Sequence, residues 1–213
     1  MDSNDAPRSS ARQERRKAAT RAKIQEAAEA LFESRGYANT SIEDISEQAD
    51  VAVRTVYMHF PSKASIMLDY FDRWLDAFSL AIRQRPVNEP VVVTVKEALA
   101  AMGAAGWIDR ARPDAVKIYP IIEHLDSGSP DVAGHILQRW MREMSLLAED
   151  ARERGDYPVD SLEPQARASA VFAAWFSAMS ATRARTLSHD NVTLEQVDDA
   201  GLEVLRVMTA GNL

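Results

Sequence analysis

The sequence predicts an all-α protein with a small N-terminal unit of short helices followed by a larger helical body. Apolar residues recur at intervals of three and four along most of the 213-residue chain, the period of an amphipathic helix, and strand-like alternation is nearly absent. Glycine, proline and short polar clusters interrupt this pattern repeatedly, so the ends of most helices can be placed. The early segments are short and the later ones are long.

The composition is that of an ordinary globular protein. Hydrophobic residues make up 46% of the chain and charged residues 27%, and there is no cysteine. Disulfides, thiolate nucleophiles and zinc-thiolate sites are therefore excluded. The N-terminus has no apolar core of a signal peptide, and no stretch approaches the roughly 18 apolar residues that a membrane span needs. We expect a soluble, cytoplasmic protein without a membrane partner.

The charge is unevenly distributed, although the net charge is -7. Between positions 8 and 23 only Glu14 opposes the basic residues Arg8, Arg12, Arg15, Arg16, Lys17, Arg21 and Lys23. This part of the chain is suited to contact phosphate, whereas the chain after Lys63 is acidic in sum. Taken alone, the pattern fits a solvated tail at least as well, and we expect residues 1–15 to form a disordered basic arm.

Three short helices are predicted in residues 16–62. The first ends at Gly36 and carries its apolar face on Ile24, Ala27, Ala28, Leu31 and Phe32. Thr40 and Glu43 have the spacing of a capping box, and Ile42, Ile45 and Ala49 form the buried stripe of the second helix. After a break at 50–52, the third helix spans 53–60 and ends before Pro61, and Ser62 is the next N-cap.

The second and third helices match the description of a helix-turn-helix over residues 42–60, because a turn of three or four residues joins them. Any small three-helix unit gives the same spacing, so spacing alone does not decide between DNA binding and a purely structural unit. The third helix, however, concentrates hydrogen-bond donors next to a basic arm: Arg54, Thr55, Tyr57 and His59. These residue types favour DNA binding.

The residues from Arg21 to Lys63 resemble the N-terminal signature of the TetR/AcrR family of transcriptional regulators. The resemblance rests on Arg21, Ile24, Ala27, Ala28, Leu31, Phe32, Gly36, Tyr37, Thr40, Ser41, Asp44, Ile45, Ala49, Val51, Thr55, Val56, Tyr57, His59, Phe60, Ser62 and Lys63. It implies a three-helix DNA-binding domain, which we place at 16–62. It also implies a ligand-binding and dimerisation domain of about six helices, which we place at 63–213.

The resemblance also implies roles for individual residues. Val53, Arg54 and Thr55 would face the bases, and Arg54 can donate two hydrogen bonds to guanine in the major groove. Phosphates would be held by Thr40, Tyr57, His59 and Lys63, and the interface would also include Arg21 and Ser41. A packed structural role for His59 remains open. The buried residues would include Ala49, Val51, Val56 and Phe60, together with the apolar stripes of the first two helices.

Two positions depart from the family pattern, which has glycine where this chain has Asp50 and serine or threonine where it has Ala52. Aspartate adopts the left-handed backbone conformation more readily than most residues, so we expect the turn to persist. Without a hydroxyl cap, the third helix loses about 1 kcal/mol of stabilisation.

The chain after Pro61 predicts six longer helices. Their expected bounds are 63–85, 90–105, 112–126, 130–154, 162–188 and 193–211. The β-like run 91–95 leads directly into a helical pattern, so we interpret it as the first turns of a helix. The last two helices carry apolar stripes that can pack within one subunit or against a second copy. These stripes include Val171, Ala174, Trp175, Val204 and Met208. We expect a symmetric homodimer held by these two helices.

Aromatic residues in the later helices are together candidates for a ligand pocket between helices, although for any single one packing in the core or in a dimer is the more common role. The candidates are Trp74, Phe78, Trp107, Tyr119, His124, Trp140, Met144, Phe172, Trp175 and Phe176. Asp69, Asp72 and Asp76 share one helix face, which we interpret as a solvated acidic surface and not as a metal site.

We therefore expect a transcriptional regulator that binds palindromic operator DNA as a dimer and is released by a small hydrophobic or amphipathic ligand. A repressor is the expected mode of action. The alternative is a DNA-binding regulator without a small-molecule ligand, switched by a protein partner. No P-loop, HExxH or GxSxG motif is present in the sequence, so an enzyme is not expected, and neither a cofactor nor a metal is.

Overall fold

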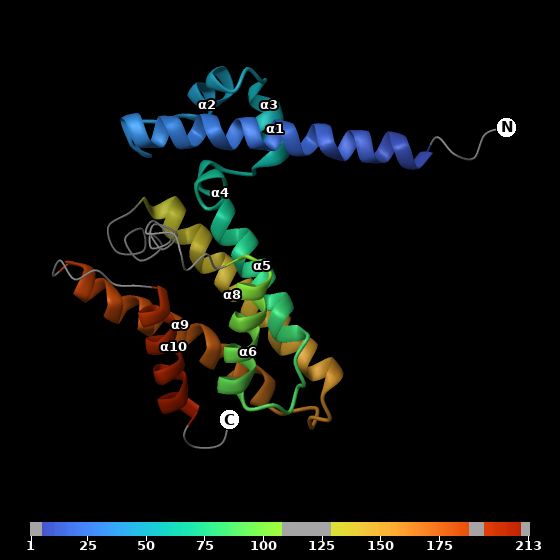
Figure 1. Cartoon of the computed structure of the whole chain (residues 1–213), viewed down its shortest axis with the longest axis vertical. Helices are drawn as coiled ribbons and strands as arrows, with labels where there is room; N and C mark the ends of the chain where they lie inside the picture. The colour runs from blue at the N-terminus through green and yellow to red at the C-terminus, as the bar shows by residue number, and fades with distance from the viewer. Residues whose placement is uncertain (1–5, 108–128, 188–193, 210–213) are drawn as a thin grey trace. The chain divides into compact units, whose positions relative to one another are not determined.

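The computed structural model describes residues 6–107, 129–187 and 194–209, and these residues form helices joined by short connections without a strand. The chain divides into two compact units, Met1–Asp69 and Tyr70–Leu213. The division lies within the first turn of α5 (Asp69–Arg83), shown in green in Figure 1. No helix of the described residues is long and apolar enough to cross a membrane.

The first unit contains α1 (Ala6–Arg35), α2 (Ile42–Gln48), α3 (Val53–His59) and α4 (Lys63–Met67). All four helices contribute to one core. Its buried members are Ile24, Ala27, Ala28, Leu31, Ile42, Ile45, Ala49, Val56, Phe60 and Ile66, with Phe32, Val51 and Val53 packed against them. The expected apolar faces of the first three helices are therefore confirmed as core, and the α2–α3 pair has the helix-turn-helix arrangement.

Two local features of this unit differ from the sequence-based expectation. Residues 6–15, expected to be disordered, form the first turns of the 30-residue α1, and their alanine, arginine, glutamine and glutamate side chains are good helix formers. The N-cap of α2 is Ser41, with Asp44 as its capping-box partner, and not the expected pair of Thr40 and Glu43. Both pairs have the required spacing, but the Thr40 side chain is buried.

The second unit contains α5, α6 (Val91–Ala104), α8 (Pro130–Arg154), α9 (Glu163–Leu187) and α10 (Leu194–Thr209). Within it, α9 packs against α6, α8 and α10. The interpretation of the run 91–95 as the start of a helix is confirmed by α6. The expected helix at 112–126 lies outside the described residues.

The expected single helix over 63–85 is divided at Leu68, which separates α4 from α5. Leu68 leaves the regular helical conformation, with φ -99° and ψ 14°. The N-terminus of α4 is as expected, since Ser62 caps it and forms a capping box with Ser65.

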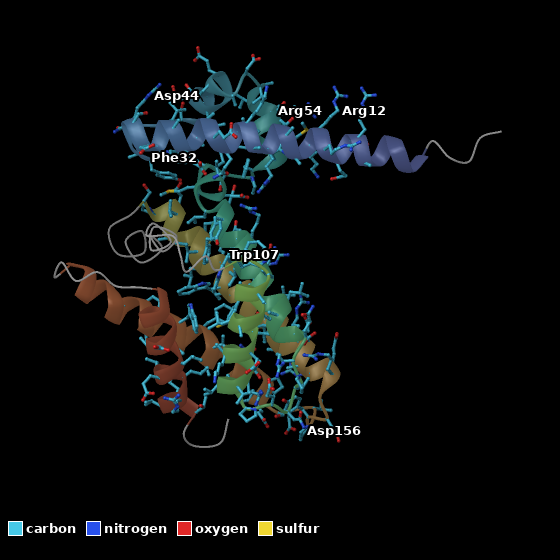
Figure 2. The ribbon with its side chains drawn as sticks, viewed as in Figure 1. Arg12, Phe32, Asp44, Arg54, Trp107 and Asp156 are labelled. Atoms are coloured by element: carbon cyan, nitrogen blue, oxygen red, sulfur yellow. The ribbon has the colours of Figure 1, made fainter. Side chains whose placement is uncertain are left out.

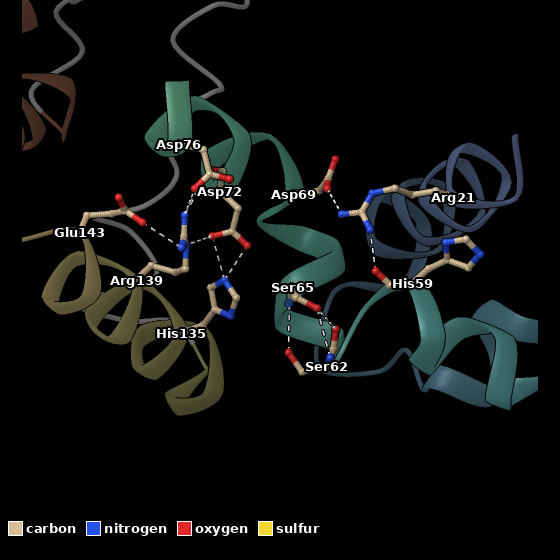
Figure 3. Close-up of polar contacts among 10 residues, drawn as sticks. All are labelled: Arg21, His59, Ser62, Ser65, Asp69, Asp72, Asp76, His135, Arg139 and Glu143. Atoms are coloured by element: carbon tan, nitrogen blue, oxygen red, sulfur yellow. Dashed lines mark hydrogen bonds and ion pairs between the residues drawn. The ribbon is translucent and has the colours of Figure 1, made fainter. Parts of the chain in front are cut away.

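The three aspartates of α5 do not form a solvated acidic surface. Asp69 is buried and pairs with Arg21 in the first unit. In the second unit, Asp72 and Asp76 bind Arg139 of α8 at 3.0 and 2.6 Å. Nε2 of His135 also lies 2.9 Å from Asp72 (Figure 3). Sequence spacing showed that the aspartates share one side of a helix, but their cationic partners come from distant segments.

The same network continues into the interior of the second unit. Arg139 also pairs with the buried Glu143 at 3.1 Å, one turn along α8. Glu143 in turn accepts a 2.7 Å hydrogen bond from the buried hydroxyl of Ser79 on α5. Because buried charged and polar groups are costly unless they are paired, this network specifies how α5 and α8 align.

Candidate DNA interface and ligand pocket

The turn before α3 sets the direction of that helix. Asp50 has φ 51°, the left-handed conformation expected for it. The backbone N–H of Val51 then donates to the Ser46 carbonyl at 3.0 Å. Ala52 is the N-cap of α3 and makes no side-chain cap, as the sequence predicted. At the other end, Phe60 is extended and buried, so α3 is anchored by its last turn and by Val56.

The outer face of α3 is polar at its start and carries large side chains further on. Arg54 is exposed, Thr55 is half-buried, and Tyr57 and Met58 are 52% and 67% exposed. Val53, which was expected to face the bases, packs partly against the core. In the view of Figure 2, Arg54 lies on the same side of α1 as Arg12. A short helix with an anchored inner face and an exposed cationic outer face can enter a major groove.

Arg21 uses its guanidinium inside the first unit. It pairs with the buried carboxylate of Asp69 and donates to the backbone carbonyl of His59 (Figure 3). Its central carbon also lies 3.9 Å from the centroid of the Phe60 ring. It therefore ties α1 to the end of α3 and to the start of α5. The sequence placed Arg21 in the DNA interface, and the structure shows that both of its terminal nitrogens, Nη1 and Nη2, are engaged by the protein itself.

His59 is half-buried, and its Nδ1 atom has no hydrogen-bond partner among the described residues. Burial lowers the pKa of the imidazole, and the nearby charges of Arg21 and Lys17 lower it further. His59 is therefore neutral at neutral pH. It can donate one hydrogen bond there but brings no positive charge to a phosphate.

Lys63 and Thr40 also serve the interior of the first unit. The ammonium group of Lys63 donates to the carbonyls of Tyr37 and Thr40, both at 2.8 Å, and lies 4.1 Å from the Tyr37 ring centroid. The Thr40 hydroxyl donates to the Gly36 carbonyl at 3.0 Å. These contacts satisfy carbonyls at and after the end of α1, where helical partners run out.

Ser41 is exposed and caps α2. Its hydroxyl accepts the Asp44 N–H at 3.0 Å, and the Asp44 carboxylate accepts the Ser41 N–H at 2.8 Å. The backbone and side-chain hydrogen bonds from Ser41 lower the pKa of Asp44 below its ordinary value. The Ser41 hydroxyl also donates to the Asp44 carboxylate at 2.7 Å, so the start of α2 is closed by its own side chains.

Exposed cations of α1 are not among the contact residues inferred from the family signature, because they precede it. Arg12, Arg15, Arg16 and Lys17 are all exposed on consecutive turns of this helix. Their charge was visible in the sequence, but the place of Arg12 and Arg15 on an ordered helix was not. A rigid helix presents such charges to a phosphate backbone at lower entropic cost than a disordered arm.

In the second unit, five of the ten pocket candidates line one cavity: Trp74, Phe78, Trp140, Phe172 and Trp175. Phe71, Leu75 and Val171 complete its lining, and its volume is about 20 Å³. Trp74 and Phe78 stack at 5.1 Å between ring centroids, and Phe78 lies 5.7 Å from Trp175. Aromatic side chains from α5, α8 and α9 thus meet in one place.

The other candidates lie apart from this cavity or outside the described residues. Phe176 is 46% exposed and meets the Trp140 ring edge-on at 5.8 Å. Trp107 accepts a hydrogen bond from Tyr70 at its carbonyl, and Met144 is half-buried but does not line the cavity. Tyr119 and His124 lie outside the described residues.

Residues 24–70 match the sequence profile of the family described as bacterial regulatory proteins, tetR family. The chain is 25% identical over 137 residues to the HTH-type transcriptional regulator EthR of Mycolicibacterium smegmatis, a match that covers 62% of this chain and 60% of EthR. It is 29% identical over 204 residues to the HTH-type transcriptional regulator TtgR of Pseudomonas putida, which covers 90% of this chain and 93% of TtgR.

The fold is similar to that of Thermus thermophilus FadR, a TetR family transcriptional repressor whose structure was solved in complex with lauroyl-CoA. The TM-score is 0.55 at 21% identity, over 91% of this chain and 95% of FadR. This likeness concerns the fold alone. The signature residues, the helix-turn-helix arrangement and the relatives all indicate the same family, and none of these relatives is an enzyme. The chain is a transcriptional regulator of the TetR family.

Proposed function

We propose that this protein is a repressor that binds palindromic operator DNA as a homodimer and leaves it when a small hydrophobic or amphipathic molecule binds the second unit. The observation that carries the DNA-binding part is the exposed outer face of α3. Arg54 is exposed there and makes no ion pair within the described residues, whereas the inner face of the same helix is buried through Val56.

Contacts to DNA divide into two classes. Arg54 and Thr55 would read base edges in the major groove, with Val53 beside them, while Tyr57 and neutral His59 would donate to phosphates. Ser41 would lie at the same interface, with its hydroxyl held by Asp44. Arg12, Arg15, Arg16 and Lys17 would supply phosphate contacts from α1. Arg21, Thr40 and Lys63 would support the interface by holding α1, α3 and the loop between α1 and α2 in place.

The proposed DNA-binding domain covers 16–62, and the ligand-binding and dimerisation domain covers 63–213. The first compact unit extends beyond the proposed DNA-binding domain, to Asp69. Ile66 of α4 belongs to its core, so α4 would help to stabilise the DNA-binding domain. In the homodimer, α9 and α10 would form the interface. Several residues of the expected apolar stripe on α9 are buried within the subunit, including Val171, Ala174 and Trp175. Exposed apolar side chains remain at Phe176, Val207 and Met208.

The test of DNA recognition compares Arg54→Ala with Arg12→Ala on the intact protein. The DNA probes are a sequence selected by the protein from a random duplex pool and an unrelated duplex of equal length. Arg54→Ala should cost about 1–3 kcal/mol on the selected sequence and little on the unrelated one. Arg12→Ala should weaken both and reduce the dependence of affinity on salt. Equal losses on both duplexes for Arg54→Ala would assign that residue to the phosphate class.

Ligand control is supported by the aromatic cavity of the second unit, since pockets between helices of bundles are common ligand sites. A dimer reads half-sites one helical turn apart, about 34 Å, so a ligand that changes the spacing of the two α3 helices weakens binding. A hundredfold release requires about 2.7 kcal/mol of ligand preference for the non-binding arrangement.

The ligand-controlled mode and the alternative of a protein partner are separated by measuring melting temperature and operator affinity with hydrophobic compounds. A compound that binds only the native state raises the melting temperature. If stabilising compounds also release the operator, the ligand-controlled mode is supported. If no compound in a broad hydrophobic set does either, control by a protein partner is favoured.

A further inference from the structure

The Trp175 indole N–H is buried and finds no acceptor among the residues that the structure describes. Trp175 is only 5% exposed, and its Nε1 atom has no hydrogen-bond partner among the described residues. Three other described residues carry such a buried atom, namely Gln25, His59 and Arg83, and none of these lines the aromatic cavity. A buried donor that stays unsatisfied lowers the stability of the folded protein. The presence of such a donor in the lining of the aromatic cavity therefore points to a function.

The orientation of the indole is set from behind by α10. A Cβ atom at Gly201 would lie 3.0 Å from Cζ3 and 3.2 Å from Cε3 of Trp175, so the six-membered ring rests directly on the glycine. In an indole, these two carbons lie on the edge opposite Nε1. Nε1 is not among the ring atoms nearest Gly201, and the ring packs at 38° against Phe78.

Water is a poor occupant for this cavity. Its volume of about 20 Å³ admits roughly one water molecule, but a buried water needs two to four polar partners. The eight lining side chains carry no hydrogen-bond acceptor, because an indole N–H only donates. None of them is charged either, so an ionised ligand group would be buried without a counter-charge.

We propose that the effector is an uncharged compound with a flat, apolar body and one carbonyl oxygen, and that this oxygen accepts a hydrogen bond from Trp175 Nε1. This inference rests on the proposed ligand control and names the chemical class of the ligand. The aromatic walls provide the stacking surface for the body, and the Trp175 N–H selects the acceptor.

Entry requires the walls to separate, because the cavity is far smaller than such a ligand. Trp140 is the lining residue whose ring meets the exposed Phe176 edge-on, and it is itself only half-buried. Displacing Trp140 sacrifices less buried area than displacing Trp74 or Phe78, which are buried. The ligand would therefore enter on the Trp140 side and take a place among α5, α8 and α9.

The experiment uses acetophenone and α-methylstyrene, two flat molecules of nearly equal shape. The methylene group of α-methylstyrene stands where acetophenone has its carbonyl oxygen. Their affinities are measured for the unmodified protein, for Trp175→Phe and for Trp140→Phe, the matched control for loss of an indole. Comparing affinity ratios between proteins cancels the different hydrophobicity of the two probes. The indole N–H signals in nitrogen-15 correlation spectra are recorded at the same time, and Trp175→Phe identifies the Trp175 signal.

We expect the ratio of ketone to hydrocarbon affinity to fall about fivefold in Trp175→Phe, which is the effect of losing one net hydrogen bond. The ratio should stay unchanged in Trp140→Phe. The Trp175 N–H signal should move downfield with acetophenone and not with α-methylstyrene. An unchanged ratio in Trp175→Phe overturns the proposal, and so does failure of both probes to bind a protein whose melting curve shows it to be folded.

Operator affinity measured with the same probes separates this inference from the proposed function. If acetophenone binds through Trp175 and the operator is still held, the ligand class stands and the proposed control by this site is wrong. If other compounds release the operator while ketones leave the Trp175 signal unmoved, the control stands and the ligand class is wrong.

Discussion

Arg21 on α1 forms an ion pair with Asp69, the first residue of α5, across 48 residues of sequence. The carboxylate is buried and the guanidinium is partly exposed, so the pair closes the end of the first unit (Figure 3). The same guanidinium holds the His59 carbonyl, which lies at the end of α3. The position of the helix that carries Arg54 is thus linked to an aspartate far along the chain.

Removing the cation should damage the first unit more than neutralising its partner. Arg21→Ala leaves the buried Asp69 carboxylate and the His59 carbonyl without this donor, and we expect a loss of about 1–3 kcal/mol in the free energy of unfolding. Asp69→Asn keeps a polar group opposite the guanidinium and should cost less. Urea denaturation followed by circular dichroism measures both, and a larger loss for Asp69→Asn would contradict the assigned roles.

Lys63 should act as a structural residue and not as a phosphate contact alone. Lys63→Met removes two hydrogen bonds to the carbonyls of Tyr37 and Thr40, so the melting temperature should fall by an amount equivalent to about 1–3 kcal/mol. Lys23→Met, at an exposed position of α1, is the matched control and should leave stability nearly unchanged. If Lys63→Met only lowers the salt dependence of DNA binding, its role lies at the DNA backbone.

His59 should make the stability of the protein depend on pH in a defined direction. Burial and the charges of Arg21 and Lys17 lower the folded-state pKa of His59. Below the unfolded-state pKa of about 6.5, the unfolded chain takes up the proton first, so the folded state loses stability as the pH falls further. The free energy of unfolding should decline from pH 7 to pH 5, and the decline should be shallower in His59→Gln. Identical pH profiles for the two proteins would show that His59 is not responsible.

The homodimer should depend on exposed apolar residues of the last helix. Val207 is 69% exposed on α10, so Val207→Glu should place a charge in the proposed interface and raise the dimer dissociation constant by at least tenfold. Val159→Glu makes the same change at a fully exposed position outside the helices and should have no effect. Sedimentation equilibrium measures both, and a monomeric unmodified protein at micromolar concentration would refute the dimer.

The periodicity of apolar residues, together with the positions of glycine, proline and short polar clusters, determined most of the helices of this protein. The apolar stripes of the first unit, the left-handed Asp50, the uncapped Ala52, the bounds of α6 and α8 and the start of α9 were all predictable. The physical reason is that these features are local: a helix face, a cap or a turn is decided by residues within a few positions of one another. The exposure of Arg54 follows from the same local pattern.

Only the tertiary structure decided which charged groups meet. Arg21, Lys63 and the aspartates of α5 look solvent-exposed in the sequence, yet their partners lie 23 to 67 residues away. The choice of Ser41 over Thr40 as the cap of α2 likewise depended on Thr40 turning toward the end of α1. The cavity around Trp175 was equally unpredictable from the sequence. A stripe of aromatic residues has the same sequence pattern whether its side chains pack completely or leave a cavity and an unsatisfied donor. Such outcomes depend on how separate helices dock, and the periodicity of a single helix contains no information about its distant neighbours.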